Sequence, residues 1–288
     1  MKGFDIMSEN FIDSYKTIIK VSPDLYDDGL KQTVQEVGKF IARIPKAINA
    51  AFSPLDIWIA NKEYNVEETK LLLAKKLENI DPEKIVSPEP YVAVPALQAI
   101  SYSMNSDELR ELYSNLLANS MNSDKKTFVH PAFVEIIKQL SPLDATNLKL
   151  IFKKKCCPIV NYYVHSEDSE KQQSYKKNVF LENSSCTDID LSSVSITNLF
   201  RLSLIEIDFS KHIHDSFYDK FLEHPLFTKL QNLCTKAKIA NEQLLINGCC
   251  SFETIDSLSL GELHIPSIEK GLVQMTPLGK SFTEMCIN

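Results

Sequence analysis

Apolar residues recur at intervals of three and four through most of the first half of the chain, which is the spacing of one helix face. The clearest run begins at Asn105 or Ser106, whose side chains suit a helix start, and Asp107 and Glu108 follow in the first turn. Its apolar positions are Leu109, Leu112, Tyr113, Leu116, Leu117 and Met121. The same spacing predicts further helices over residues 8–21, 24–49, 65–80 and 91–103.

Two more helices are predicted to begin at proline. Pro131 follows His130, and Pro142 follows Ser141. Proline suits the first helical position, because its missing N–H donor has no partner there in any case. Asp144 lies three positions after Ser141, which is typical of a capping box. Two proline starts in succession indicate an abrupt change of direction of the chain.

The second half of the chain mixes helical and strand-like patterns. Residues 158–190 are rich in Ser, Lys, Tyr and Asn, which predicts a loop-rich stretch with one strand-like run at 178–182. A predicted helix over 191–202 precedes an alternating, strand-like run at 204–209. A second alternating run lies at 271–276, directly before a last predicted helix.

Together these elements predict a mainly α fold. We expect an N-terminal helical bundle over residues 1–139, followed by a winged-helix-like α+β module over residues 140–288. The two alternating runs would form the wing, and a long helical insertion at about residues 211–265 would separate them. Such an insertion departs from the short hairpin loops that are the norm.

Composition argues against several classes of function. The formal net charge of −7 opposes binding to a phosphate backbone. Most of this charge belongs to residues 156–288, where 11 Lys and Arg face 17 Asp and Glu, whereas residues 1–155 contain 20 against 21. Only 7 glycines leave few positions for phosphate-binding loops, and neither G-x-x-x-x-G-K-[ST] nor G-x-G-x-x-G occurs. We therefore expect no nucleotide and no other cofactor.

The cysteines and histidines do not form a recognisable site. Seven cysteines without a C-x-x-C motif predict reduced thiols and no zinc site. His212 and His214 would point apart in a helix, and no third ligand lies at a metal-site spacing nearby, so we predict no metal site. Cys156 and Cys157 follow three lysines that would favour thiolates, although lysines at a helix C-terminus also complement the helix dipole. Reduced thiols and an N-terminus without a secretory pattern predict a cytoplasmic protein.

Residues 40–60 form the most apolar stretch and raise the question of a membrane. Arg43, Lys46 and Asp56 interrupt the stretch, so a spanning helix of about 20 apolar residues is not available. A buried helix pair is the simpler interpretation, and peripheral membrane contact with Trp58 as the anchor is the alternative.

DNA binding is a second alternative, because winged helices often read a groove. The predicted helix over 191–202 offers Arg201 and Asn198 for this purpose, next to Asp188 and Asp190. A basic footprint is missing and the second half of the chain is acidic, which favours protein contact over nucleic acid.

Four stretches together resemble the abortive infection alpha (Abi-alpha) family of bacteria. They are GKFIARIPKAINAAFSPLDIW, VPALQAISYSMNSDELRELYSNLLANSM, VHPAFVEIIKQLSPLDATNLKLI and, more loosely, LVQMTPLGKSFTEMCI. The resemblance implies a role in antiviral defence, in which a cell infected by phage is arrested or killed before progeny emerge. It implies no catalytic residues that would carry over to this chain.

We therefore expect a non-enzymatic sensor or adaptor that acts by protein–protein contact, with a protein partner or as a homo-oligomer. The candidate partner-binding residues lie on the expected polar face of the helix after Ser106: Arg110, Glu111, Ser114, Asn115 and Asn119. A membrane-associated effector, a DNA-binding regulator and an enzyme with an unrecognised site stay open as alternatives.

Overall fold

The computed structural model describes residues 72–78, 80–100, 106–166, 171–246, 254–255, 258–259 and 265–287. These residues belong to two compact units that divide between Val134 and Glu135, and each unit is described by itself. The helices predicted before residue 65, and the apolar segment 40–60 with Trp58, lie outside the described residues. The predicted division into domains at residues 139 and 140 stays a prediction.

The first unit is helical in its described part. Its elements are a helical stretch at 72–77, η2 (Pro82–Lys84), α5 (Pro90–Ile100), α6 (Asp107–Ser120), η3 (Lys126–Phe128) and the start of α7 (Ala132–Lys138). Helix α6 confirms the clearest sequence pattern, because Ser106 caps it by accepting a hydrogen bond from the Leu109 backbone N–H at 3.3 Å. The Val86 N–H donates to the Met121 carbonyl at 2.8 Å, which holds the connector before α5 against the end of α6.

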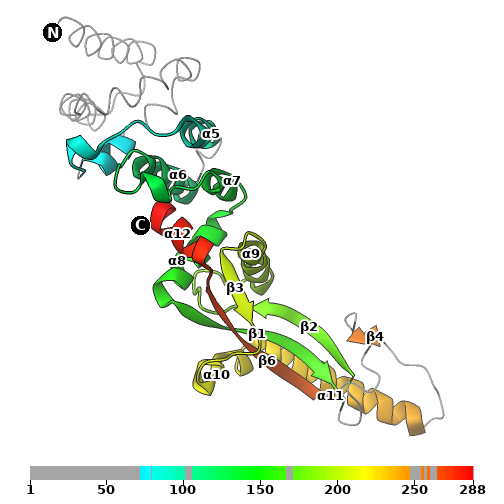
Figure 1. Cartoon of the computed structure of the whole chain (residues 1–288). Coiled ribbons are helices and arrows are strands. Elements are labelled where there is room, and N and C mark those ends of the chain that lie inside the picture. Colours follow the sequence, from blue (N-terminus) through cyan, green and yellow to red (C-terminus); the bar gives the residue numbers. More distant parts are fainter. Residues whose placement is uncertain are drawn as a thin grey trace, which may run out of the picture. The chain divides into compact units, whose positions relative to one another are not determined.

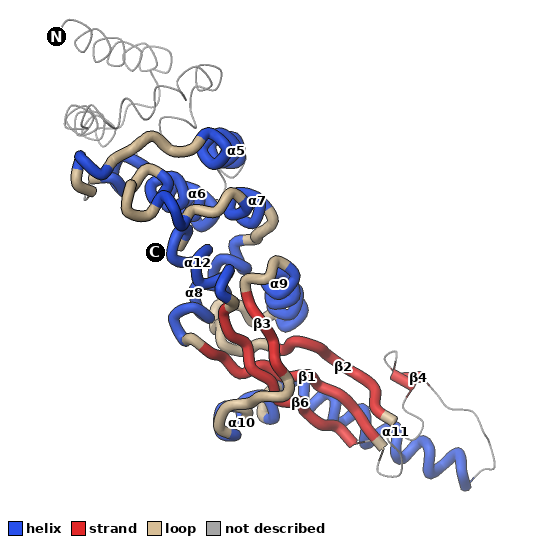
Figure 2. Tube along the Cα trace, viewed as in Figure 1, coloured by secondary structure: helices blue, strands red, loops and turns tan. Residues whose placement is uncertain are grey.

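The second unit combines helices with a sheet, as Figures 1 and 2 show. Its helices are α8 (Pro142–Lys154), α9 (Ile189–Arg201), η4 (Asp215–Phe217), α10 (Asp219–Leu222), α11 (Pro225–Ile246) and α12 (Pro277–Cys286). Its strands are β1 (Cys156–His165), β2 (Gln172–Val179), β3 (Ile205–Asp208), β4 (Thr254–Ile255), β5 (Leu258–Ser259) and β6 (Ile265–Met275). The predicted capping box is confirmed, since the Ser141 N–H donates to Asp144 at 2.7 Å and the Asp144 N–H donates to Ser141 at 3.1 Å.

The main sheet has four antiparallel strands in the order β2-β1-β6-β3. Strand β1 pairs with β6 along its whole length, from Cys156 opposite Gln274 to His165 opposite Ile265. The far end of β6 also pairs with β3, where Ile205 lies opposite Met275. The two strands predicted as a wing therefore exist and pair, but they are part of a larger sheet.

This sheet shows that the prediction of a mainly α fold with a winged-helix-like module is wrong. The described residues are α+β, with a four-stranded antiparallel sheet in the place of the expected two-stranded wing. The stretch predicted as loop-rich forms the hairpin of β1 and β2. Its strand character was hidden, because Pro158 and many polar residues surround the β-forming Ile159 and Val160. Strand β2 is polar because it is an edge strand with one face in water.

One face of the sheet packs on α10 and α11, and Figure 1 shows α11 running along β1 and β6. The buried core between them contains Val160, Tyr162, Val164, Val179, Tyr218, Phe221, Phe227, Leu230, Cys234 and Ala237. Side chains alternate along a strand, so residues between these core positions point to the opposite face. On that face α9 contacts β2 and β3, and α8 contacts β1 and β6.

Candidate functional site

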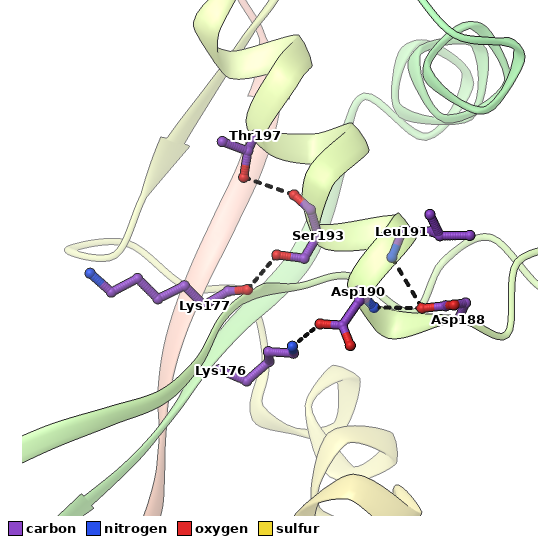
Figure 3. A network of polar contacts seen from close by, with 7 residues as sticks. All are labelled: Lys176, Lys177, Asp188, Asp190, Leu191, Ser193 and Thr197. Atoms are coloured by element: carbon purple, nitrogen blue, oxygen red, sulfur yellow. Dashed lines mark hydrogen bonds and ion pairs between the residues drawn. The ribbon is translucent and has the colours of Figure 1, made fainter. Parts of the chain in front are cut away.

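Helix α9 is the element of the second unit whose surroundings most favour a functional role. Its first turn is capped by Asp188, whose carboxylate accepts the backbone N–H groups of Asp190 at 2.8 Å and Leu191 at 3.1 Å. Figure 3 shows how its first turns lie against β2: Asp190 pairs with Lys176, and the Ser193 hydroxyl donates to the Lys177 carbonyl at 2.8 Å. The start of the helix is therefore fixed to the edge of the sheet.

A second set of hydrogen bonds fixes α9 to α8. The buried amide of Asn147 donates to the Ser195 hydroxyl at 2.9 Å, and it accepts from the Asn183 amide at 2.7 Å. Asn198 donates to the Asp144 carboxylate and to the Gln139 carbonyl, both at 2.9 Å. When polar groups between two helices all have hydrogen-bond partners, they favour one arrangement of those helices, here α8 and α9.

Arg201 and Asn198, the two residues considered for contacts with DNA bases, form hydrogen bonds within the protein. The guanidinium of Arg201 donates to the Asn198 side-chain oxygen at 2.8 and 3.1 Å, and to the Gln139 side chain at 3.0 Å. Asn198 is occupied with α8, as described above. Both side chains therefore hold α9 in place, and reading a base would require them to leave these partners.

Helix α9 exposes more large apolar side chains than an ordinary surface helix, although Ile196 and Leu199 face the core. Ser192 and Ser195 are buried beside Ile196 and Leu199, and the Ser192 hydroxyl donates to the Phe180 carbonyl at 3.0 Å. Three large apolar side chains remain outside: Leu191 is 56% exposed, Val194 65% and Phe200 52%. A surface helix normally turns its apolar residues to the core, so the exposed half of α9 is a candidate contact surface.

At about 100° per residue, Val194 lies near the middle of the exposed half, with Leu191 and Phe200 toward its two sides. We call these three residues the α9 surface. Thr197 is exposed between them, and its hydroxyl donates to the Ser193 carbonyl at 2.7 Å. The surface thus combines apolar anchors with polar groups, as protein interfaces do.

A charged junction joins the end of α8, the start of α10 and the segment after β2. The carboxylate of Glu182 is nearly buried and pairs with Lys154 at the end of α8 and with Lys220 of α10. Burial raises the pKa of Glu182, but the hydrogen bonds from both lysines outweigh this effect, and its pKa is lowered overall. The same bond raises the pKa of Lys154. The junction is a structural tie in which each charge has a partner.

Adjacent Cys157 is not an activated thiol. Burial raises its pKa to about 12, in spite of the nearby Lys154. Cys156 points the other way along β1 and is exposed. Cys157 is therefore a core residue.

The structure places the predicted partner-binding residues mostly inside the fold. Ser114, Asn115 and Asn119 are buried, so the expectation that they form a wet face is wrong. Arg110 is half-buried and pairs with Asp107, whereas Glu111 is exposed and lies 3.8 Å from Lys76. Contact with a partner through these five residues stays a prediction, and Glu111 is the residue among them that reaches the surface.

The remaining candidates are found in structural roles or outside the described residues. His214 caps η4 by accepting from the Ser216 N–H at 3.3 Å, and Asp215 pairs with Lys270 at 2.8 Å. Within the described ranges, no group of three metal-ligating side chains occurs. The same ranges contain no helix that is long and apolar enough to cross a membrane. Trp58 lies outside them.

Comparison with known proteins gives the chain its family. A solved structure from the hydrocarbon-degrading marine bacterium Alcanivorax borkumensis SK2, an uncharacterized protein, is 12% identical, with a TM-score of 0.29, and the match covers 58% of this chain and 96% of that chain. No curated protein matches. The model of the family described as abortive infection alpha matches residues 61–286. This match covers well over half of the sequence, so the protein belongs to the abortive infection alpha family.

Proposed function

We propose that this protein serves abortive infection as a sensor or adaptor that binds another protein through the α9 surface. Membership in the family supports the defence role. The observation that carries the mode of action is the exposure of three large apolar side chains of α9, each more than half exposed, on a helix that is fixed to the sheet and to α8.

The size of the surface favours a transient partner over a stable dimer. Stable interfaces bury about 800 Å² on each partner, which is more than three side chains of one helix provide. The anchoring of α9 to β2 and α8 supports binding through this surface, because a preorganised surface loses little entropy on binding. The partner we propose is a different protein with an apolar pocket that receives Val194 and its neighbours.

The test is a phage challenge of bacteria that carry the gene with its neighbours. Val194→Gln should lower protection by about fivefold or more, because an apolar contact at the centre of an interface that contributes about 1 kcal/mol changes affinity by that factor. The matched control is Ile239→Gln on α11, a residue that is also about half exposed at 50%. Glutamine suits a helix at both positions, so both variants should unfold at the same temperature as the unchanged protein.

Full protection by Val194→Gln, Leu191→Gln and Phe200→Gln would refute the α9 surface. A loss of protection in Ile239→Gln of the same size would also refute it, because the effect would then belong to exposed apolar residues in general. If size-exclusion chromatography shows an oligomer of the unchanged protein that Val194→Gln dissolves, the occupant is a second copy and the proposed hetero-partner is wrong.

A further inference from the structure

The end of β1 and the start of β6 bring a histidine and a serine together on the face of the sheet opposite α11. Tyr162 and Val164 pack in the core, so alternation along β1 turns His165 to the other face. Ile268 packs against the same core, so Ser267 of β6 also faces away from α11. Both residues are half-buried.

Two hydrogen bonds define the state of the His165 ring. Its Nδ1 lies 3.1 Å from the Ser166 carbonyl oxygen, and its Nε2 lies 3.1 Å from the Ser267 hydroxyl oxygen. A carbonyl oxygen only accepts, so Nδ1 carries the proton of the neutral ring. Nε2 then has a free electron pair, and the Ser267 hydroxyl donates to it. This is the order of nucleophile, base and orienting acceptor that activates a serine.

The surroundings hold this order in place. The Ser166 N–H donates to the Lys171 carbonyl at 3.2 Å, which closes the β1–β2 hairpin and fixes the group that orients the ring. The aromatic ring of Tyr163 lies next to the imidazole ring of His165, and the centres of the two rings are 5.8 Å apart. Tyr163 and Ser267 are directly opposite each other in the sheet.

The ordinary alternative is a cross-strand polar pair that contributes about 0.2–1 kcal/mol to the sheet. That role needs one bond between the strands, whereas His165 also makes the second bond at Nδ1 that selects its tautomer. Ser174 of β2 provides a comparison with Ser267. It pairs with Tyr163 from the neighbouring strand β2, on the side of β1 away from β6, and it is exposed. Ser267 is the serine to which the His165 Nε2 is bonded.

We propose that Ser267 and His165 form a nucleophile–base pair that hydrolyses neutral carboxylic esters. The Ser267 oxygen attacks the ester carbonyl carbon while its proton passes to Nε2 of His165. The bond to the alcohol oxygen breaks, and His165 returns the proton to that oxygen. Water then attacks the acyl-serine and gives a proton to Nε2, and the carboxylic acid leaves as Ser267 regains its proton.

The charge on the same face selects a neutral substrate. Glu269 alternates with Ser267 along β6 and accepts a hydrogen bond from the Asn161 amide at 2.7 Å. A carboxylate in this position repels anionic substrates such as phosphate esters. With this activity, Ser267 and His165 become the residues of the enzymatic alternative that the sequence left open. The activity does not depend on the α9 surface, so either proposal can fail without the other.

The test treats the full chain with a fluorophosphonate, which bonds to activated serines, and maps the modified peptide by mass spectrometry. Ser267 should be labelled, and Ser267→Ala should abolish the labelling. His165→Gln should slow it about 100-fold or more, since a general base contributes at least that factor. Ser174→Ala is the matched control on the same face and should be labelled at the unchanged rate. Hydrolysis of p-nitrophenyl acetate should follow the same order.

Two outcomes would overturn the proposal. One is an unlabelled Ser267 in a protein that circular dichroism shows to be folded. The other is labelling that His165→Gln leaves unchanged, because the serine would then react without the imidazole. Circular dichroism and the melting temperature of each variant separate loss of the reaction from loss of the fold.

Discussion

At the scale of the residue, Gly279 shows how closely α12 approaches Leu204, the residue directly before β3. The Thr276 N–H donates to the Leu204 carbonyl at 3.1 Å, and its hydroxyl caps α12 by accepting from the Gly279 N–H at 2.9 Å. A Cβ atom at Gly279 would lie 1.9 Å from the Leu204 carbonyl oxygen. No side chain fits at this distance unless the backbone shifts.

Gly279→Ala should therefore lower the free energy of unfolding by about 2 kcal/mol, as overpacking does. Helix propensity alone predicts the opposite sign, since alanine is better than glycine in a helix by about 1 kcal/mol. Urea unfolding decides between the two signs. Lys280→Ala, at the exposed neighbouring position, should change stability by less than about 0.5 kcal/mol.

The capping residues are where sequence reasoning succeeded at this scale. Ser141 and Asp144 bond to each other's backbone, and their spacing in the sequence is sufficient to predict it. Ser114, Asn115 and Asn119 are the opposite case. Their burial depends on what packs around α6, and a helical pattern with polar positions contains no information about such neighbours.

At the scale of the element, the start of α9 decides whether Leu191 keeps its place on the α9 surface. Asp188→Ala removes the acceptor of two backbone N–H groups and should lower the free energy of unfolding by about 1 kcal/mol. Thermal unfolding measures the change. Asp188→Asn is the control, because asparagine caps as well as aspartate, and it should stay within a few tenths of a kcal/mol. An equal loss in both variants would mean that the charge matters and the cap does not.

The helices were predicted better than the strands, for a physical reason. A helix satisfies its own hydrogen bonds, so its pattern lies within one stretch of sequence, as in α6 and α8. Strand β2 gains its partners from β1, and its exposed face selects polar residues that look like a loop. The Ser267–His165 pair was equally hidden, because residues about 100 positions apart meet only through the register of β1 with β6.

At the scale of the whole molecule, the junction at Glu182 links the acid stability of the second unit to one carboxylate. Its pKa is lowered in the folded state, so its contribution is present at neutral pH and is lost as pH falls through the ordinary range near 4.3 and below. Glu182→Gln should lower the free energy of unfolding at pH 7 by about 1–2 kcal/mol, since two half-exposed lysines lose their partner.

Urea unfolding between pH 3 and pH 7 tests this expectation, and the variant should lose less stability than the unchanged protein as the solution becomes acidic. Glu135→Gln serves as the control, because Glu135 and Lys138 form a solvent-exposed ion pair. Such pairs contribute about 0.5 kcal/mol or less to the free energy of unfolding. Parallel pH curves for Glu182→Gln and the unchanged protein would show that the junction does not govern acid stability.

The central place of β6 in the sheet bears on how the protein is made. Strands β1 and β3 both pair with β6, which comes later in the chain. Residues that pair between β1 and β6 are 100 positions apart at His165 and Ile265, and 118 apart at Cys156 and Gln274. A nascent chain that has reached β3 but not β6 therefore presents two unpaired strand edges, and such edges invite aggregation. Contacts this distant also form slowly. The main sheet can form only after β6 has been synthesised. A ribosome that stalls before β6 therefore produces a chain that cannot fold its sheet.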